Sequence, residues 1–332
     1  MQLRIRQNYI SKENTDCLKG LFAVAVVLCH IYGRRPFGAS FGIGVLFTAL
    51  GYLSVAAFLF FSGYGLTVSY QSKGATYLNG FLKKRVLPTY IVQAFLIIVY
   101  TVFNLCIGIP VSQSVILQSF FFGKTVVVNG WYIQAIIVFY LLFYIVCRIS
   151  GGKYMSLFMT IGIVGYVLIC ALCRLPSTWY EASFAFLCGI EFAQNKDKID
   201  SAFMKMPNTY IATLLTAIVL LCVTFLFGNA GILPLFLKIP LKMLSAVCFV
   251  VCMLLTVMKV KINFPPVRFI GKYYFEIYIL QGIYLVVFDK VFVMRNGLLY
   301  GLSVGISTFL TALCVHPLIQ YIYRICRNTL KD

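Results

Sequence analysis

Charged residues are scarce in this chain of 332 residues. They make up 11% of it, where soluble domains have roughly 25%, and hydrophobic residues make up 61%. A chain with so little charge cannot cover a folded surface with polar groups in water. Its apolar residues also form runs of about 18 or more, such as 210–227 and 241–258, long enough to span a membrane. We therefore predict a polytopic integral membrane protein and exclude a soluble domain.

Acidic residues and histidines are few as well. There are 9 Asp and Glu against 28 Lys and Arg, with a formal net charge of +19 and 2 histidines. A basic chain can bind nucleic acid, but in a membrane protein the cytoplasmic retention of Lys and Arg explains the excess. We therefore predict no nucleic-acid partner. Cys170 and Cys173 form a single CxxC with no second pair and no nearby histidine, so we predict no metal site.

The apolar runs predict an all-α fold of about ten transmembrane helices, because backbone groups in lipid must be satisfied within their own segment. The predicted spans are 17–33, 46–70, 88–107, 131–147, 154–173, 178–194, 208–228, 240–258, 269–288 and 298–321. No connecting segment has the length or pattern of a soluble domain, so residues 1–332 are predicted to form a single membrane domain. The longest polar-leaning connection, 110–130, is expected to lie in the interface or to re-enter the membrane.

Basic residues predict the orientation. With the N-terminus in the cytoplasm and alternating spans, nineteen Lys and Arg fall inside and eight outside, which agrees with the positive-inside rule. Both termini are then cytoplasmic. The polar N-terminal segment predicts no cleavable signal peptide, so the first span is expected to act as a signal anchor.

The first span carries two ionisable residues, which are costly in a membrane and therefore candidates for function. Lys19 and His30 are eleven residues apart, so they share one helix face with a rise of about 16 Å between them. Lys19 is expected near the cytoplasmic surface and His30 past the middle of the span. This suits a phosphate-bearing donor at Lys19 and proton transfer at His30. The alternative is a snorkelling lysine and a histidine that only packs.

Five segments, in order, resemble the acyltransferase 3 family. The first is the K-x10-H of Lys19 and His30 within DCLKGLFAVAVVLCH. The others are FLFFSGYGLTVSY at 58–70, KKRVLPTY at 83–90, WYIQAIIVFYLLFYIV at 131–146 and IGKYYFEIYILQG at 270–282. Two departures stand out. Gln281 replaces a histidine that many members have, and the Arg-x-x-Arg motif before proline is compressed to Lys83-Lys84-Arg85.

The resemblance implies a membrane O-acyltransferase that moves an acyl group, usually acetyl, from acetyl-CoA to a hydroxyl of a carbohydrate outside a bacterial cytoplasmic membrane. A base at His30 would help a hydroxyl attack a thioester. Cytoplasmic cations would bind the phosphates of CoA, which is a co-substrate, and the candidates are Lys19, Lys83, Lys84 and Arg85. Plain positive-inside topology is the alternative explanation for 83–85.

Further candidates lie in the later spans. Glu276 is expected either to orient His30 or bind an acceptor hydroxyl, or else to be a structural carboxyl paired with a tyrosine or a basic group. Trp179 and Glu181 are expected at the outer mouth, where aromatic rings stack on sugars or form an interfacial belt. Arg34, one turn after His30, is a candidate for an oxyanion or an anionic acceptor, although an exposed loop arginine is the simpler interpretation. His316 is predicted to be structural.

Two other functions compete with acyl transfer. A transporter or exporter of a polysaccharide or a small anionic metabolite would also place polar residues in its spans, but no inverted repeat is visible. A non-catalytic scaffold would not need His30 or Glu276 in lipid. The predicted partners are therefore acyl-CoA, an extracytoplasmic carbohydrate or glycolipid acceptor, and the lipid bilayer. The acceptor sugar and the oligomeric state do not follow from the sequence.

Overall fold

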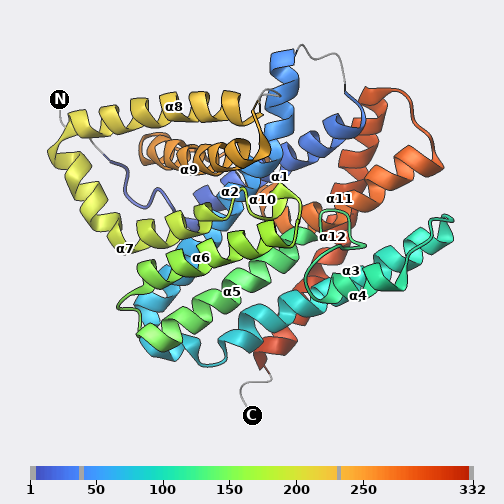
Figure 1. The fold of residues 1–332 in the computed structure, drawn as a ribbon, viewed down its shortest axis with the longest axis horizontal. Helices are drawn as coiled ribbons and strands as arrows, with labels where there is room; N and C mark the ends of the chain where they lie inside the picture. Colours follow the sequence, from blue (N-terminus) through green and yellow to red (C-terminus); the bar gives the residue numbers. More distant parts are fainter. Residues whose placement is uncertain (1–4, 37–40, 230–232, 329–332) are drawn as a thin grey trace. The chain divides into compact units, whose positions relative to one another are not determined.

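The computed structural model describes residues 5–36, 41–229 and 233–328, and the fold is the predicted all-α membrane architecture (Figure 1). Within these residues, 8 helical segments are long and apolar enough to cross a membrane. They are built on α1 (Lys12–Arg34), α2 (Phe41–Lys73), α3 (Leu87–Cys106), α5 (Trp131–Ser150), α6 (Met155–Leu172), α8 (Pro207–Asn229), α9 (Leu235–Lys259) and α12 (Gly297–Asn328). The polytopic membrane class is thus confirmed.

Two further predicted spans are helical but fall outside this set. The span predicted at 178–194 has a 3-10 turn at Ser177–Trp179, and its α-helix, α7 (Phe184–Lys205), starts later and runs into a charged second half. The span predicted at 269–288 is broken into α10 (Pro265–Gly271) and α11 (Tyr274–Val286). The helix α11 continues directly into a π-helical turn, Val287–Val291. The combined segment carries three charged residues, Glu276, Asp289 and Lys290, whereas each of the eight apolar segments contains an 18-residue stretch with at most two.

The chain divides into two compact units, each built from three separate stretches. Unit 1 comprises Met1–Val26, Val45–Ser72 and Ser156–Lys272, and unit 2 comprises Val27–Gly44, Lys73–Met155 and Tyr273–Asp332. Neither unit is contiguous in sequence, which is why no boundary between them is visible as a linker. The first helix, α1, contributes its beginning to unit 1 and its end to unit 2.

Glycines allow close helix packing in unit 1, where α8 and α9 also run side by side (Figure 1). A β-carbon on Gly271 of α10 would overlap the carbonyl oxygen of Asp16 in α1, and one on Gly20 would overlap the carbonyl of Val267. Small residues let membrane helices approach to backbone contact in this way. The end of α10 is thus held directly against α1 through its last residue, Gly271.

In unit 2 the segment 110–130 is neither a plain loop nor a span. It forms the short helix α4 (Gln113–Phe120), followed by an irregular stretch in which Val126 and Val127 are buried. Irregular backbone at depth needs polar partners, and side chains supply them. Ser119 Oγ accepts from the Val126 amide at 2.8 Å, and Gln134 Oε1 accepts from the Gly123 amide at 3.1 Å. This stretch places Asn129 beside His30, at the site described below.

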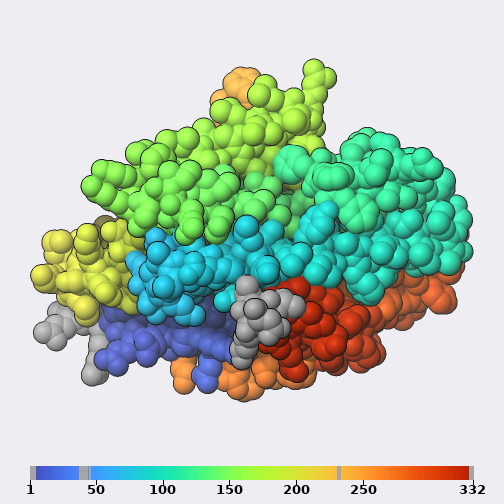
Figure 2. Space-filling model, turned by 90° about the horizontal axis from the view of Figure 1, so that it is seen from below, coloured from blue at the N-terminus to red at the C-terminus, as the bar shows by residue number. Residues whose placement is uncertain are grey.

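Unit 2 also brings the end of the chain back against the third helix. Figure 2 shows α12, in red, beside α3, in cyan. Thr89 of α3 and Tyr323 of α12 are joined by a hydroxyl–hydroxyl hydrogen bond of 3.0 Å. The two helices thereby place basic residues from distant parts of the sequence in one neighbourhood.

Candidate active site

His30 lies near the end of α1, in unit 2, and its imidazole is held by Gln281 of α11. His30 Nδ1 and Gln281 Oε1 are 3.1 Å apart. The Gln281 amide is itself oriented, because its Nε2 donates to the Tyr278 carbonyl oxygen at 3.1 Å. Its Oε1 therefore faces the ring as an acceptor, and Nδ1 is the donor. In the neutral imidazole this leaves Nε2 unprotonated, which is the form that a general base needs.

Asn129 approaches the same ring nitrogen from the irregular stretch before α5. Its Nδ2 lies 3.4 Å from His30 Nδ1, farther than Gln281. The Tyr278 hydroxyl donates to the Asn129 carbonyl at 3.2 Å, and the φ of 61° at Asn129 is left-handed, which asparagine adopts more readily than most residues. Since Nδ1 cannot donate and accept at once, the shorter contact with Gln281 determines the tautomer, and Asn129 closes one side of the ring.

Neither partner of His30 follows from the sequence pattern. Gln281 is visible there only as a departure from the family, and its contact with His30 joins residues 251 positions apart. Asn129 precedes Gly130, and an Asn-Gly pair is a turn signal. That signal predicts a sharp turn before the helix at Trp131, but it does not predict which side chain the turn meets.

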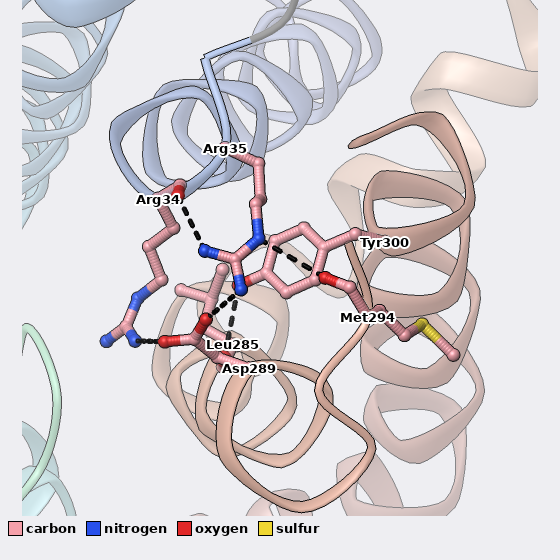
Figure 3. A network of polar contacts seen from close by, with 6 residues as sticks. All are labelled: Arg34, Arg35, Leu285, Asp289, Met294 and Tyr300. Atoms are coloured by element: carbon pink, nitrogen blue, oxygen red, sulfur yellow. Dashed lines mark hydrogen bonds and ion pairs between the residues drawn. The ribbon is translucent and has the colours of Figure 1, made fainter. Parts of the chain in front are cut away.

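Arg34 and Arg35, just beyond His30, share the carboxylate of Asp289 (Figure 3). Arg34 Nη1 lies 3.1 Å from Asp289 Oδ2, and Arg35 Nη2 contacts Oδ1 of the same residue. The side chain of Arg34 is 32% exposed and that of Asp289 17%. Two guanidinium groups face one carboxylate, so the cluster keeps a net positive charge one turn from His30. Arg34 therefore has the charge and the exposure that are needed to bind an anionic group.

Arg35 is held in place by further contacts, and it is not among the candidates predicted from the sequence. It donates to the carbonyl oxygens of Met294 at 3.2 Å and of Arg34 at 3.0 Å, and its guanidinium lies 5.4 Å from the centre of the Tyr300 ring. Asp289 is presented by a π-helical turn, Val287–Val291, that continues α11. Such turns are frequent at functional sites. These contacts hold Arg35 in place, and Arg35 in turn holds Asp289 and, through it, Arg34.

Glu276 pairs with His316 of α12. Glu276 Oε1 lies 2.7 Å from His316 Nδ1, with the carboxyl side chain 3% exposed and the imidazole 26%. The contact agrees with the interpretation of Glu276 as a carboxyl paired with a basic group. Glu276 and Gln281 are five residues apart on α11, or about 140° around its axis. They therefore point to different sides, and Gln281 rather than Glu276 orients His30.

A basic cavity of about 470 Å³ lies in unit 2. Two of its cations were predicted, Lys84 and Arg85, on the π-helical turn Leu82–Val86 before α3. Four cations and three aromatic rings line it: Lys73, Lys84, Arg85, Arg327, Tyr77, Phe81 and Tyr323. Phosphate groups favour such a cluster of cations, and a nucleobase can stack on the rings. Arg327 and Tyr323 come from the opposite end of the sequence, so no local motif indicates them.

The remaining predicted cations lie elsewhere. Lys19 is half-buried on α1, in the part of that helix that belongs to unit 1. Lys83 is exposed on the same π-helical turn as Lys84 and Arg85 but does not line the cavity. The helix α1 is continuous from Lys12 to Arg34, so the predicted spacing of Lys19 and His30 along one helix is present.

Trp179 and Glu181 lie within unit 1. Both residues are buried, with Trp179 5% exposed and Glu181 3%. Glu181 Oε2 is 3.4 Å from Lys242 Nζ and accepts from Ser177 Oγ at 3.1 Å. A buried indole presents no free face to a sugar, and this carboxylate already has its counter-ion. Both residues therefore support the packing of unit 1, which does not fit the predicted sugar-binding role.

Comparison with known proteins connects this geometry to a family. The sequence model of the family described as an acyltransferase domain, acyltransferase 3, matches residues 13–316. The match spans α1 through most of α12 and includes His30, Gln281, Glu276 and the basic turn before α3. No curated protein and no solved structure matches the chain significantly.

Proposed function

The chain belongs to the acyltransferase 3 family and is a membrane acyltransferase, and on this basis we propose its donor, acceptor and base. The donor is acyl-CoA, with acetyl as the acyl group. The acceptor is a hydroxyl of an extracytoplasmic polysaccharide or glycolipid at a bacterial cytoplasmic membrane. His30 is the general base. The observation that carries the proposal is the hydrogen bond from His30 Nδ1 to Gln281 Oε1, which leaves Nε2 as a base.

The chemistry requires a base because a hydroxyl is a poor nucleophile at neutral pH. His30 Nε2 takes the hydroxyl proton as the oxygen attacks the thioester carbonyl carbon. The carbon–sulphur bond then breaks, the acyl group stays on the acceptor oxygen and CoA leaves. Gln281 keeps the ring in the tautomer that can accept this proton, and it can still accept the Nδ1 hydrogen when the ring becomes charged.

The donor site is proposed at the basic cavity of unit 2. Its cations suit the pyrophosphate and the 3′-phosphate of CoA, and Arg85 and Arg327 can each give a phosphate two parallel hydrogen bonds. The rings of Tyr77 and Tyr323 suit the adenine. Lys83, on the same turn as Arg85, stays a candidate for contacts with these phosphates, and Lys19 stays a donor-site candidate on its spacing from His30 alone.

The acceptor side is proposed at Arg34. Its position four residues after His30 puts the two side chains on one face of α1. The ion pair between Arg35 and Asp289 holds the cluster in place. A guanidinium here can steady either the oxyanion of the tetrahedral intermediate or an anionic group of the acceptor.

The experiment follows label from donor to acceptor. Membrane vesicles containing the protein are incubated with acetyl-CoA labelled in the acetyl group, and the extracted glycans are assayed for alkali-labile label, which marks an ester. His30→Gln should lose about 10² to 10⁴ in rate and still bind acetyl-CoA. Leu28→Ala, at an exposed position of the same helix, is the matched control and should keep the wild-type rate.

The outcome also separates the competing function. A transporter or exporter would move its cargo across the vesicle membrane without consuming acetyl-CoA. Export without loss of acetyl-CoA would overturn the acyl-transfer proposal. Equal transfer by His30→Gln and wild type would retain acyl transfer but remove His30 as its base.

A further inference from the structure

The side chain of Asn129 carries hydrogen-bond donors that the orientation of His30 leaves unused. Its Nδ2 lies 3.4 Å from His30 Nδ1, but that ring nitrogen bears the hydrogen that Gln281 Oε1 accepts at 3.1 Å. A nitrogen that donates cannot also accept, so the two N–H bonds of the Asn129 amide are not spent on the ring. Within the part of the chain that the structure describes, this amide has no other hydrogen-bonding partner. Two donors beside the proposed base are therefore available to a substrate.

The imidazole of His30 and the amide of Asn129 are both open to a ligand. Each of the two residues is half-buried, whereas Gln281, which orients the ring, is fully buried at 0% exposure. The side of the ring that faces Gln281 is thus closed. A reacting group can meet the imidazole and the amide together, because only 3.4 Å separates them and both belong to unit 2.

The backbone holds this amide in a conformation that costs free energy. The φ of 61° at Asn129 lies in the left-handed region, which residues other than glycine rarely adopt. Two hydrogen bonds keep it there: the Tyr278 hydroxyl donates to the Asn129 carbonyl at 3.2 Å, and the Gly130 amide donates to the Val127 carbonyl at 2.9 Å. A β-carbon at Gly130 would lie 2.8 Å from Val127 Cβ, so the turn is tight. Residues held in such conformations cluster at active sites.

Building on the proposed function, we propose that Asn129 is a further catalytic residue, which donates a hydrogen bond to the carbonyl oxygen of the acyl group. As the acceptor oxygen bonds to the carbonyl carbon, an electron pair moves onto the carbonyl oxygen and negative charge develops there. The Asn129 amide stabilises this oxyanion until the pair reforms the carbonyl and the carbon–sulphur bond breaks. The hydroxyl proton goes to His30 Nε2 and leaves with CoA, which departs as a thiol, so Asn129 itself transfers no proton.

The reach of the two groups suits one reacting carbon. A general base must lie about 2.6–3.2 Å from the hydroxyl oxygen, and an oxyanion donor must lie about 2.7–3.1 Å from the carbonyl oxygen. In the tetrahedral intermediate these two oxygens are bonded to the same carbon. Nδ1 and Nε2 of His30 are likewise atoms of one five-membered ring. An amide that lies beside Nδ1 is therefore close enough to bind the second oxygen while Nε2 binds the first.

This assignment separates the role of Asn129 from that of Arg34. Arg34 is a permanent cation paired with Asp289, and it lies about one turn beyond His30 on α1. Such a cation binds an anionic group already in the ground state. A neutral amide with unused donors gains most from a charge that appears only in the transition state, which is the kind of interaction that raises kcat. The oxyanion therefore falls to Asn129, and Arg34 is left to an anionic group of the acceptor.

The test removes the amide and keeps the turn. Asn129→Gly retains the left-handed conformation, which glycine adopts readily, and loses both donors. The full-length protein in lipid nanodiscs transfers acetyl from acetyl-CoA to hydroxylamine, and the acetohydroxamate is quantified by mass spectrometry. We expect kcat to fall about 10²- to 10³-fold with an unchanged Kd for acetyl-CoA, because the oxyanion forms only after the attack. Asn129→Asp should fall at least as far, because a carboxylate repels the oxyanion. Lys124→Gly, exposed on the same stretch, should keep the wild-type rate.

A second background shows whether Asn129 acts on the substrate or only through His30. Hydroxylamine needs little help from a base, so transfer by His30→Gln stays measurable. Adding Asn129→Gly to His30→Gln should slow this transfer about tenfold or more, because an oxyanion donor contributes without the base. An equal rate with and without Asn129→Gly in that background, or a wild-type kcat for Asn129→Gly alone, would overturn the inference and leave the proposed function standing. A wild-type protein that forms no acetohydroxamate would overturn the proposed function, and this inference with it.

Discussion

Gln281 Oε1 lies 3.1 Å from His30 Nδ1, and the Gln281 amide is locked by its second hydrogen bond to the Tyr278 carbonyl. An amide that can face the ring in only one way selects one imidazole tautomer. Gln281 therefore orients the ring of His30, the residue that we propose as the base.

The first prediction concerns this contact. Gln281→Leu removes the acceptor for the Nδ1 hydrogen, so the ring loses its preferred tautomer and its fixed position. We expect kcat for acetyl transfer to fall about 10²-fold, the cost of a small misplacement of a catalytic group, with little change in acetyl-CoA binding. Gln281→His, which can also accept from Nδ1, should keep more activity than Gln281→Leu. The reverse order would show that Gln281 acts through packing alone.

The second prediction concerns the basic cavity. Arg85→Ala and Arg327→Ala should each raise the Kd for acetyl-CoA about tenfold or more, because each removes charge-assisted hydrogen bonds worth roughly 1.5–3 kcal/mol. Isothermal titration at two salt concentrations measures this, and the wild-type affinity should depend more steeply on salt than that of either variant. Arg324→Ala is the control, since Arg324 is exposed on the same helix but does not line the cavity. If all three variants bound equally, the phosphates would have to bind elsewhere.

The third prediction concerns the cluster in Figure 3. Asp289→Ala leaves Arg34 and Arg35 without their shared counter-ion, both only partly exposed. Such a loss should lower the free energy of unfolding by about 1–3 kcal/mol, seen as a lower Tm in detergent. Lys290→Ala, at the neighbouring exposed position, should leave Tm unchanged. Restored stability in a variant that lacks Asp289 and both arginines would confirm that the charges, not the cavity left behind, cause the effect.

The fourth prediction concerns the helix contact in unit 1. Gly271→Ala forces a methyl group onto the Asp16 carbonyl, and overpacking of this kind costs about 1–3 kcal/mol. Gly165→Ala in α6 adds the same methyl group where no atom lies within 4 Å, so it should be neutral or slightly stabilising. The two variants are compared by thermal unfolding in one detergent. Equal Tm values would mean that α1 and α10 do not pack this closely.

The fifth prediction concerns orientation, which still rests on the count of basic residues. Reporter fusions after Lys205 should report the cytoplasm, and one after Arg174 should report the outside. A cytoplasmic signal after Arg174 would break the predicted alternation of spans, and with it the placement of donor and acceptor on opposite sides.

The sequence by itself determined the class of protein, most of the helices and one catalytic candidate. Apolar runs such as 210–227 dictate helices because lipid offers no other partner for the backbone, and the spacing of Lys19 and His30 is preserved because it lies within one continuous helix. These are local properties, and a local pattern is enough to predict them. The family also follows from motifs in order along the chain, and the match to residues 13–316 bears it out.

Only the tertiary structure decided how the candidates are grouped. His30 meets Gln281 across 251 positions and Asn129 across 99, and Glu276 meets His316 across 40. Helical periodicity specifies which face a residue occupies but not which helix covers that face. The sequence therefore allowed Glu276 to orient His30, whereas in the structure Glu276 faces His316 of α12. Arg327 joined the basic cavity for the same reason, because packing of α12 on α3 brings the end of the chain to a turn more than two hundred residues earlier.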